Sequence, residues 1–394
     1  MTQSGEEILC DDVIRAVCLK IGWGDAVRCD YRLARPWYRF PKCDKHSILD
    51  MNTQMKGFNN MRKRKIYVLA TGGTIAGAAD SAAATTGYRA GQLGIGQLLQ
   101  DLPAADDSIE LVGEEIAAID SKDITEEVLL KLARRTQEVL SESETAGVVI
   151  THGTDTLEET AYFLHLTLHT AKPVVLTGAM RPATALSADG PLNLLQAIRV
   201  ASCAASVGRG VLVVANGEIH SARDVRKVHT TAVHTFQSPG LGPLGVIDDA
   251  SIEYYRQTTR RHTLDSELQL PEQQRGGRYL PDVRILYGQA GDDGMFAAAA
   301  CSAGVRGIVY AGFGNGSVPA PVESALAAAV EQGIIVVRST RSSEGAVLTA
   351  EASYDEHGFI ASGTLSPQQS RILLQLGLLR SRDRSYILRL FREY

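Results

Sequence analysis

The stretch IYVLATGGTIAG, residues 66–77, decides the fold. Residues 66–70 are a run of apolar and β-branched side chains, which is typical of a buried strand. The run leads directly into TGGT, so Thr71 to Thr74 are predicted to lie on a turn at the carboxyl end of a parallel strand. That edge is where α/β sheets bind ligands. The glycine pair removes two side chains beside Thr74 and lets backbone amides and a substrate approach closely.

This glycine spacing excludes one familiar function. It matches neither GxGxxG nor GxxxxGK[ST], so a dinucleotide-binding or phosphate-binding loop is not predicted. A strand followed by two glycines is also, in many proteins, only a tight turn. Other parts of the chain must therefore decide whether Thr74 has a chemical role.

Short β-branched runs alternate with helical patterns from about Lys65 onward, as in βαβ units with a parallel sheet. Strands are predicted at residues 66–70, 147–150, 173–178 and 210–216, and helices at 156–169 and 190–205. Beyond a polar segment that suits an exposed linker, strands are predicted at 283–287, 307–312 and 333–339, with a helix at 321–332. We therefore predict a two-domain α/β protein. Its parts are a larger flavodoxin-like or Rossmann-like parallel sheet domain at 63–255, a linker at 256–281 and a smaller C-terminal α/β domain at 282–394.

Residues 1–62 differ from both predicted domains. They hold both tryptophans and four of the six cysteines, without a clear periodic pattern. They are interpreted as an N-terminal extension of unknown role or as sequence upstream of the true start, because Met51, Met55 and Met61 are all possible initiators. The cysteine spacings match neither a zinc site nor a disulfide framework, which favours free thiols.

Composition limits the partners. Hydrophobic residues make up 44% of the chain, and the net charge of -5 gives no electrostatic footprint for nucleic acid. No stretch approaches the roughly 20 apolar residues that span a bilayer, so no membrane partner is predicted. No secretory signal is visible at the N-terminus, which favours a cytoplasmic location, with the periplasm as the alternative if the start is wrong.

Two further loops follow predicted strands. The strand at 147–150 ends in THGTD, and a third loop, RDVRKVHTT at 223–231, carries Lys227. Asp155 and Glu158, three residues apart, also form a capping-box pattern, so the second loop has a purely structural interpretation as well. Loops that offer Thr, Thr-Asp and Lys form a plausible nucleophile, base and orienting group, although spacing in the sequence does not show that they meet.

Five motifs carry a resemblance to a known family: ATGGTIAG (70–77), VITHGTDTLEETAYF (149–163), GAMRP (178–182), SADGP (187–191) and ASGTLSPQQSR (361–371). In this order and spacing the chain, from about Lys65 to Tyr394, resembles the bacterial type II L-asparaginases. The resemblance implies that Thr74 is the nucleophile and that Tyr88 is the tyrosine on the loop beside it. It also implies that Thr154, Asp155 and Lys227 form a group in which the lysine lowers the cost of charge on the threonine oxygen. A threonine hydroxyl is protonated at neutral pH, so a neighbour must take its proton or stabilise the charge. Either Tyr88 or the group of Thr154, Asp155 and Lys227 could provide the base.

The resemblance further implies the residues that hold the substrate. Ser121 matches the serine that binds the α-carboxylate, and Asp155 also pairs with the α-ammonium group. Glu351 and Ser317 match positions that reach the site of a neighbouring subunit, which implies a homotetramer with sites at the dimer interface. Lys122 departs from the pattern, because a cation beside the substrate's ammonium group would repel it unless its stem turns the charge outward to water.

The resulting functional prediction is an L-asparagine amidohydrolase that releases L-aspartate and ammonia through an acyl-enzyme on Thr74, with no metal or cofactor. A glutaminase-asparaginase is the nearest alternative, since one methylene is discriminated by only about 1 to 3 kcal/mol. An ammonia-supplying amidotransferase subunit with an N-terminal extension and a non-catalytic amino-acid sensor are two further alternatives.

Overall fold

The computed structural model describes residues 63–83, 87–100, 102–103, 108–249, 251–270 and 280–394. Residues 62–394 form one compact unit, separate from 1–61. The predictions that concern residues 1–62 therefore lie outside the described residues, and the structure does not bear on them.

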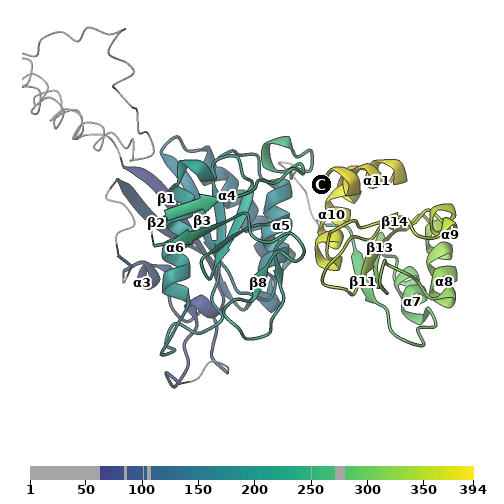
Figure 1. Ribbon diagram of the computed structural model, residues 1–394, viewed down its shortest axis with the longest axis horizontal. Helices are drawn as coiled ribbons and strands as arrows, with labels where there is room; N and C mark the ends of the chain where they lie inside the picture. The colour runs from purple at the N-terminus through teal and green to yellow at the C-terminus, as the bar shows by residue number, and fades with distance from the viewer. Residues whose placement is uncertain (1–62, 84–86, 101, 104–107, 250, 271–279) are drawn as a thin grey trace, which may run out of the picture. The chain divides into compact units, whose positions relative to one another are not determined.

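An eight-stranded sheet forms the first part of the described chain (Figure 1). The strand order is β10-β9-β6-β5-β4-β3-β1-β2. Strands β2, β1, β3, β4 and β5 are parallel, whereas β6, β9 and β10 extend one edge in antiparallel fashion. The bounds are β1 (Arg64–Gly72), β2 (Ile109–Ile119), β3 (Thr145–Thr151), β4 (Val174–Thr177), β5 (Val211–Ala215), β6 (Glu218–Ser221), β9 (Gly245–Asp248) and β10 (Ser251–Tyr254).

The order of the parallel strands confirms the predicted flavodoxin-like sheet. Read along the sheet, the five strands run 2-1-3-4-5, and the strand order reverses between β1 and β3. Ligands in such folds bind beyond the carboxyl ends of the strands at this switch point. The loops that leave β1 and β3 are the TGGT and THGTD loops, so the fold brings the first two candidate segments to the same place.

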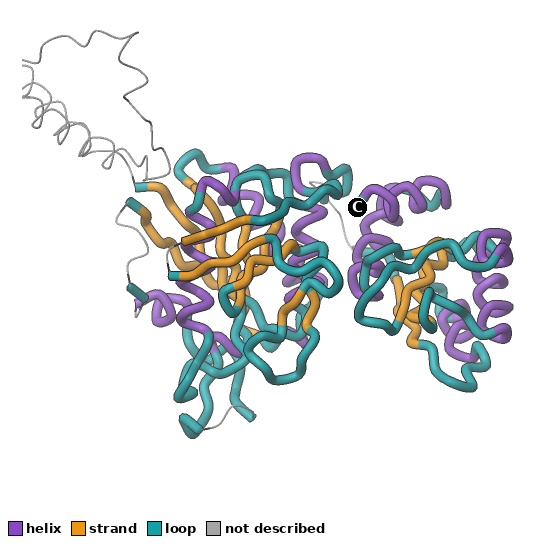
Figure 2. The backbone as a smooth tube through the Cα atoms, in the orientation of Figure 1, coloured by secondary structure: helices purple, strands orange, loops and turns teal. Residues whose placement is uncertain are grey.

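Helices cover both faces of this sheet (Figure 2). On one face, α3 and α6 pack against Val68 and Val149 through side chains such as Ile95 and Ile198. On the other, α4 and α5 bury side chains such as Leu132 against the sheet. The bounds are α3 (Ile95–Gln100), α4 (Glu126–Ser141), α5 (Leu157–Thr167) and α6 (Gly190–Ser202).

A second, four-stranded parallel sheet has the order β11-β12-β13-β14. Helices α7 and α8 pack on one of its faces, and α10 packs on the other together with α11. The bounds are β11 (Val283–Tyr287), α7 (Met295–Ser302), β12 (Gly307–Gly312), α8 (Ala320–Glu331), β13 (Ile335–Thr340), α9 (Ala352–Glu356), β14 (Ile360–Ala361), α10 (Pro367–Arg380) and α11 (Arg384–Glu393). Helix α10 begins with a complete capping box between Ser366 and Gln369. The two-domain α/β architecture predicted from the sequence is confirmed.

Helix α5 is buried on nearly every side, because it lies between the large sheet and helix α10. The described part of the segment at 256–281 also differs from an exposed linker. Leu268 is 1% exposed, and Ser266 donates to the backbone oxygen of Leu166 at 2.5 Å. Residues 263–268 of this segment therefore pack along α5 instead of crossing open solvent.

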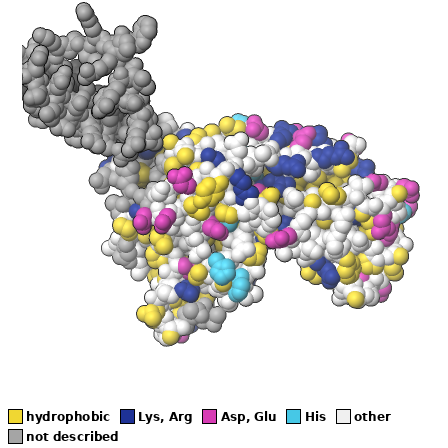
Figure 3. All heavy atoms as spheres, in the orientation of Figure 1, with side chains coloured by type: hydrophobic (Ala, Val, Ile, Leu, Met, Phe, Trp, Pro, Cys, Tyr) yellow, Lys and Arg dark blue, Asp and Glu magenta, His cyan; other side chains and the backbone are white. Residues whose placement is uncertain are grey.

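The surface carries both signs of charge on the face seen in Figure 3. In the described part of the chain, no helix combines the length and apolarity needed to cross a bilayer. The two cysteines within that part, Cys203 and Cys301, are free thiols.

Candidate active site

The loop after β1 places Thr74 at the switch point of the sheet. Gly72 and Gly73 have φ angles of 99° and 80°, in the region that favours glycine. Thr71 anchors the loop to β3, because its hydroxyl donates to the backbone oxygen of Thr151 at 3.0 Å. Thr74 then begins a short 3-10 turn, Thr74–Ala76, and is 6% exposed.

Tyr88 lies against Thr74. Their hydroxyl oxygens are 2.6 Å apart, a distance at which either one can donate to the other. Ala78 and Arg89 pair through two backbone hydrogen bonds of 3.0 Å each, and this bridge brings the segment with Tyr88 back beside the TGGT turn. The structure thus brings together the two residues predicted to start the reaction.

Close backbone approach joins the first and second loops. A Cβ atom on Gly73 would lie 2.4 Å from the Cα of Gly153, and one on Gly153 would lie 2.6 Å from the Oγ of Ser121. Real Cβ atoms do not come so near to other heavy atoms, so both positions require glycine. These glycines draw the ends of β1, β2 and β3 into a single cluster of loops.

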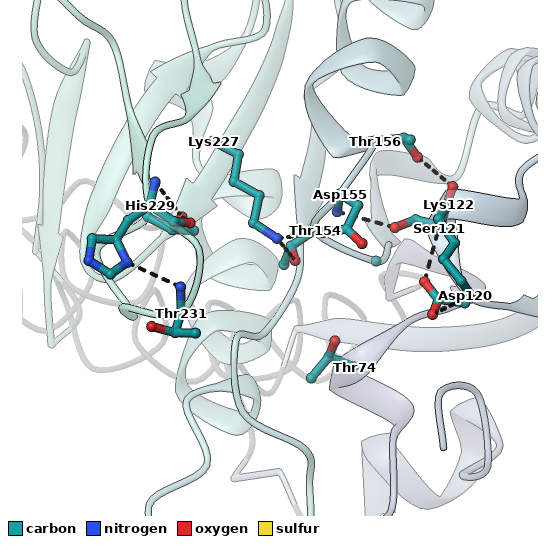
Figure 4. A network of polar contacts seen from close by, with 12 residues as sticks. Thr74, Asp120, Ser121, Lys122, Thr154, Asp155, Thr156, Lys227, His229 and Thr231 are labelled. Atoms are coloured by element: carbon teal, nitrogen blue, oxygen red, sulfur yellow. Dashed lines mark hydrogen bonds and ion pairs between the residues drawn. The ribbon is translucent and has the colours of Figure 1, made fainter. Parts of the chain in front are cut away.

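Lys227 joins the third loop to this cluster (Figure 4). It lies in the two-residue strand β7 (Arg226–Lys227), which pairs with β8 (Phe236–Gln237). Its Nζ donates to Thr154 Oγ1 at 2.9 Å and to Asp155 Oδ1 at 2.6 Å. Lys227 is 17% exposed and Thr154 is buried, whereas the Asp155 side chain is 53% exposed. The ammonium group therefore holds a buried hydroxyl and a carboxylate that is open to solvent.

Ser121 lies beside Asp155. It begins a 3-10 turn after β2 and is 3% exposed. Its Oγ accepts a hydrogen bond from the backbone N–H of Asp155 at 3.2 Å, and its backbone oxygen accepts one from the hydroxyl of Thr156 at 2.8 Å. The hydroxyl proton of Ser121 stays available to an anionic group, because the oxygen is the acceptor in the bond to Asp155.

Lys122 turns away from this cluster. Its Nζ donates to Asp123 at 2.8 Å and to Asp120 at 2.9 Å, and 60% of its side chain is exposed. Figure 4 shows Lys122 beside Asp120, across Ser121 from Lys227. Hydrogen bonds to Asp123 and Asp120 raise the pKa of Lys122. The ammonium group of Lys122, whose direction the sequence left open, thus faces two carboxylates at the surface.

Two buried titratable side chains, one within the THGTD loop and one shortly after it, were given no functional role from the sequence. His152 is 1% exposed, and its Nδ1 lies 2.7 Å from the backbone oxygen of Gly153 while Nε2 lies 3.0 Å from Thr160 Oγ1. Burial lowers the pKa of His152 to about 4, so the imidazole is neutral: Nδ1–H donates to the carbonyl, and Nε2 accepts from Thr160. His152 stiffens the loop that carries Thr154.

The second side chain, Glu158, corrects the capping-box interpretation. Helix α5 begins after Thr156 with no hydrogen bond from a side chain to its first turn. Glu158 instead accepts a hydrogen bond from the backbone N–H of Lys227 at 2.6 Å, and it is 7% exposed. Glu158 therefore does not form the predicted capping box, and it contacts a residue 69 positions away in the sequence.

Ser317 and Glu351 lie in the second domain, where Tyr354 links Glu351 to Val318, the residue after Ser317. The hydroxyl of Tyr354 accepts from the backbone N–H of Val318 at 3.0 Å and donates to Glu351 Oε1 at 3.1 Å. Within the described residues, neither Ser317 nor Glu351 makes a hydrogen bond to the loops around Thr74. In one chain the structure therefore brings these two near each other but does not bond them to the remaining candidates.

Across the described ranges, no group of three or more His, Cys, Asp and Glu side chains is arranged to hold a metal ion.

Together these features define a class of protein. A flavodoxin-like α/β sheet carries, at its switch point, a threonine hydroxyl against a tyrosine and a second threonine against a lysine–aspartate pair. Hydroxyl groups held beside a second hydroxyl and beside an ammonium–carboxylate pair suit nucleophilic catalysis.

Comparison with known proteins identifies the family. Residues 65–260 match the family model described as "Asparaginase, N-terminal", and residues 282–391 match the "Glutaminase/Asparaginase C-terminal domain". The chain therefore belongs to the asparaginase/glutaminase family.

Relatives of similar length support this assignment. The chain is 45% identical over 329 residues to L-asparaginase 2 of Bacillus subtilis, which covers 84% of this chain and 86% of the relative. It is 45% identical to L-asparaginase 2 of Escherichia coli over 84% of this chain and 93% of the relative. The glutaminase-asparaginase of Pseudomonas fluorescens biotype A is 41% identical over 84% and 90%. The crystal structure of a "Probable Cytoplasmic L-asparaginase" from Campylobacter jejuni superposes with a TM-score of 0.81 at 42% identity, covering 84% of this chain and all of that one.

Proposed function

We propose that this protein hydrolyses L-asparagine to L-aspartate and ammonia through an acyl-enzyme on Thr74. The observation that carries the proposal is the Lys227 ammonium group, which bridges Thr154 and Asp155 on the loop that packs against the Thr74 turn. Membership of the asparaginase/glutaminase family and relatives named L-asparaginase support the same activity.

In the first half of the proposed reaction, the Thr74 oxygen attacks the side-chain carboxamide carbon of the substrate. Tyr88 lies 2.6 Å from that oxygen and can relay its proton, because the Tyr88 oxygen accepts the Thr74 proton while its own hydroxyl proton passes to the leaving nitrogen. The tetrahedral oxyanion is stabilised by hydrogen-bond donors near the glycine turn, each commonly worth about 3 kcal/mol. Collapse of the intermediate breaks the C–N bond, and the leaving nitrogen takes a proton to depart as ammonia.

In the second half, water attacks the acyl carbon and Thr74 leaves with a proton. Lys227 donates to Thr154 Oγ1 and orients its hydroxyl, so that Thr154 can accept a proton from the attacking water while its own proton moves on toward the departing Thr74 oxygen. Ser121 donates to the substrate's α-carboxylate, and the exposed carboxylate of Asp155 pairs with its α-ammonium group. The hydroxyl proton of Ser121, which the bond to Asp155 leaves free, and the solvent-facing side of Asp155 support these two roles.

We propose that the working enzyme is a homotetramer in which Ser317 and Glu351 complete the site of a neighbouring subunit. Tyr354 joins Glu351 to the backbone of Val318, the residue that follows Ser317, and Leu348, near Glu351 in the sequence, is 60% exposed. A second copy covering this region would bury that apolar surface. Measurement of the mass in solution tests the assembly: a catalytically active monomer would contradict it.

A glutaminase-asparaginase remains the second candidate because relatives at 41% identity carry that name. A cytoplasmic location also stays a prediction. One related structure is titled cytoplasmic, whereas a relative from Haemophilus influenzae is titled periplasmic.

The deciding experiment measures ammonia release from L-asparagine and from L-glutamine by the wild type and Thr74→Ala. We expect activity on asparagine in the wild type and its near-complete loss in the variant. The control is Thr259→Ala, which changes an exposed threonine in the segment after β10. Equal turnover by wild type and Thr74→Ala would refute the nucleophile. Inert wild-type protein on both substrates would favour the sensor or amidotransferase alternatives.

A further inference from the structure

Glu158 occupies an unusual position for a carboxylate. It is the second residue of α5, in the motif DTLEET, and is 7% exposed. A carboxylate in the first helical turn is favoured by the helix dipole and by the free N–H groups there, yet Glu158 caps none of them. Its carboxylate oxygen instead receives the backbone N–H of Lys227 at 2.6 Å.

This hydrogen bond fixes the backbone of Lys227. Strand β7 is only two residues long and pairs with the equally short β8. The next restraint on the preceding segment comes from α10, where Gln369 Nε2 donates to the backbone oxygen of Arg223 at 2.6 Å. The contact from Glu158 is made to the Lys227 backbone itself, and Glu158 belongs to the helix that follows the THGTD loop. The same helix start thus positions Thr154, Asp155 and, through Glu158, their common partner.

The charges around Glu158 are mixed. The charged groups that face it, or face its immediate neighbours, are Glu159 on its own helix, Arg226 and Lys227 on β7, Asp155 beside the Lys227 ammonium, and Arg371 of α10, which pairs with Glu159. Burial raises the pKa of Glu158 to about 7, while the hydrogen bond from Lys227 and the charges of Arg226 and Lys227 act in the opposite direction. The charge of this side chain therefore changes close to neutral pH.

We propose that Glu158 is a positioning residue for the amidohydrolase reaction: its ionised carboxylate holds the Lys227 backbone so that the ammonium group stays on Thr154 and Asp155. This inference rests on the proposed function. A charge-assisted hydrogen bond is about twice as strong as a neutral one, so protonation of Glu158 loosens the hold on Lys227. Protonation also removes the negative charge that faces Arg226. Glu158 thereby links the geometry of the proton-accepting group to the pH of the solution.

The test compares the pH dependence of kcat/KM for L-asparagine in the wild type and Glu158→Gln. Gln keeps the size and an acceptor oxygen but has no charge at any pH. At about pH 8.5 the variant is expected to fall about tenfold below the wild type, the loss expected from one weakened charge-assisted hydrogen bond. At about pH 5.5 the two are expected to agree within about twofold, since both side chains are then neutral. The wild-type acid limb near pH 7 is thus expected to be absent from the variant.

Glu159→Gln is the matched control. It makes the same change one residue along α5, at a carboxylate that pairs with Arg371 and makes no contact with Lys227. It is expected to keep an acid limb, displaced toward lower pH because the charge of Glu159 contributes to the raised pKa of Glu158. An unchanged acid limb in Glu158→Gln, or an equal loss of that limb in Glu159→Gln, would overturn the inference.

Two further measurements keep the outcome decisive. If Glu158→Gln does not fold, Glu158→Asp is used instead, because it keeps the carboxylate on a shorter side chain. This variant is expected to lose rate at high pH while retaining an acid limb. A wild-type rate in Glu158→Asp would overturn the inference. Thr74→Ala, assayed in parallel, separates the two levels of the argument. If Thr74→Ala is fully active, the proposed function fails, whereas an inactive Thr74→Ala with an unaltered Glu158→Gln refutes only the role of Glu158.

Discussion

The replacement Glu158→Gln is also predicted to change the stability of the folded protein in a pH-dependent way. The ordinary pKa of this carboxyl group is 4.5, and burial raises it to about 7 in the folded chain. A raised carboxyl pKa means that the folded state binds the proton more tightly than the unfolded state does. The free energy of unfolding of the wild type therefore falls as pH rises from about 4.5 to about 7, because the folded chain must then hold a buried charge.

The size of the effect follows from the shift. One pKa unit corresponds to about 1.4 kcal/mol, so the rise of Glu158 from 4.5 to about 7 makes ionisation cost the folded state about 3 kcal/mol. Gln does not ionise and avoids this cost. Relative to the wild type, Glu158→Gln is expected to be similarly stable at about pH 4.5 and more stable by about 3 kcal/mol above about pH 7.5.

His152 acts in the opposite direction in the same region. Burial lowers its pKa to about 4, so protonation destabilises the folded chain as pH falls from about 6.5 toward 4. The stability of the wild type alone therefore mixes two opposed trends. The difference between Glu158→Gln and wild type removes the contribution of His152, which both proteins share.

Urea unfolding at a series of pH values measures this difference. Both proteins are compared at one subunit concentration, since association shifts apparent stability by mass action. Glu331→Gln, a change at an exposed glutamate at the end of α8, is the control and is expected to follow the wild type. Parallel curves for wild type and Glu158→Gln between about pH 5 and pH 8, or a less stable variant at the upper end, would refute the reasoning.

Two other substitutions test the site. Lys122→Gln is expected to leave the KM for L-asparagine within about twofold of wild type, because the Lys122 ammonium faces Asp120 and Asp123 in solvent, and exposed ion pairs contribute little; steady-state kinetics check this, and a clear fall in KM would place the charge near the substrate. Gly153→Ala is expected to lower kcat/KM by at least about tenfold, because the new methyl group would lie 2.6 Å from the Oγ of Ser121 and must displace that side chain; wild-type kinetics in a folded Gly153→Ala protein would contradict the tight contact between the two loops.

The central strands were predictable because their burial leaves a plain record in the sequence. Strands β1 and β3, buried on both faces, are continuous apolar runs. Strand β2 was missed because it lies at the sheet edge. Its sequence IELVGEEIAAI contains three glutamates and buries only Ile109 and Ile116. The short antiparallel strands β6, β9 and β10 were also missed, since four-residue strands have too little periodicity to identify.

The candidate site divides in a similar way. Thr74, Tyr88 and the Thr154–Asp155–Lys227 group could be named from motifs, because family motifs preserve the residues that carry chemistry. That Lys122 faces outward was left open, because Asp120 and Asp123 compete for its charge and only the turn Ser121–Asp123 decides the direction. Glu158 lay within a motif that had been assigned to helix capping, and nothing in the sequence links it to a backbone N–H 69 residues away.

Glu158 shows why the local interpretation failed where it did. A capping box would have satisfied a backbone donor at the start of α5 with a side chain near solvent, at little cost in desolvation. The carboxylate is instead buried against Lys227, where ionisation costs the folded state about 3 kcal/mol. The buried contact of Glu158 is less favourable for stability than a local cap near solvent would be, so stability alone does not explain it. Such conflicts between local preference and observed structure concentrate at functional sites. Because Gln at this position is expected to stabilise the chain and to slow the reaction at alkaline pH, opposite changes in stability and activity from one substitution would tie the buried charge of Glu158 to the work of Lys227.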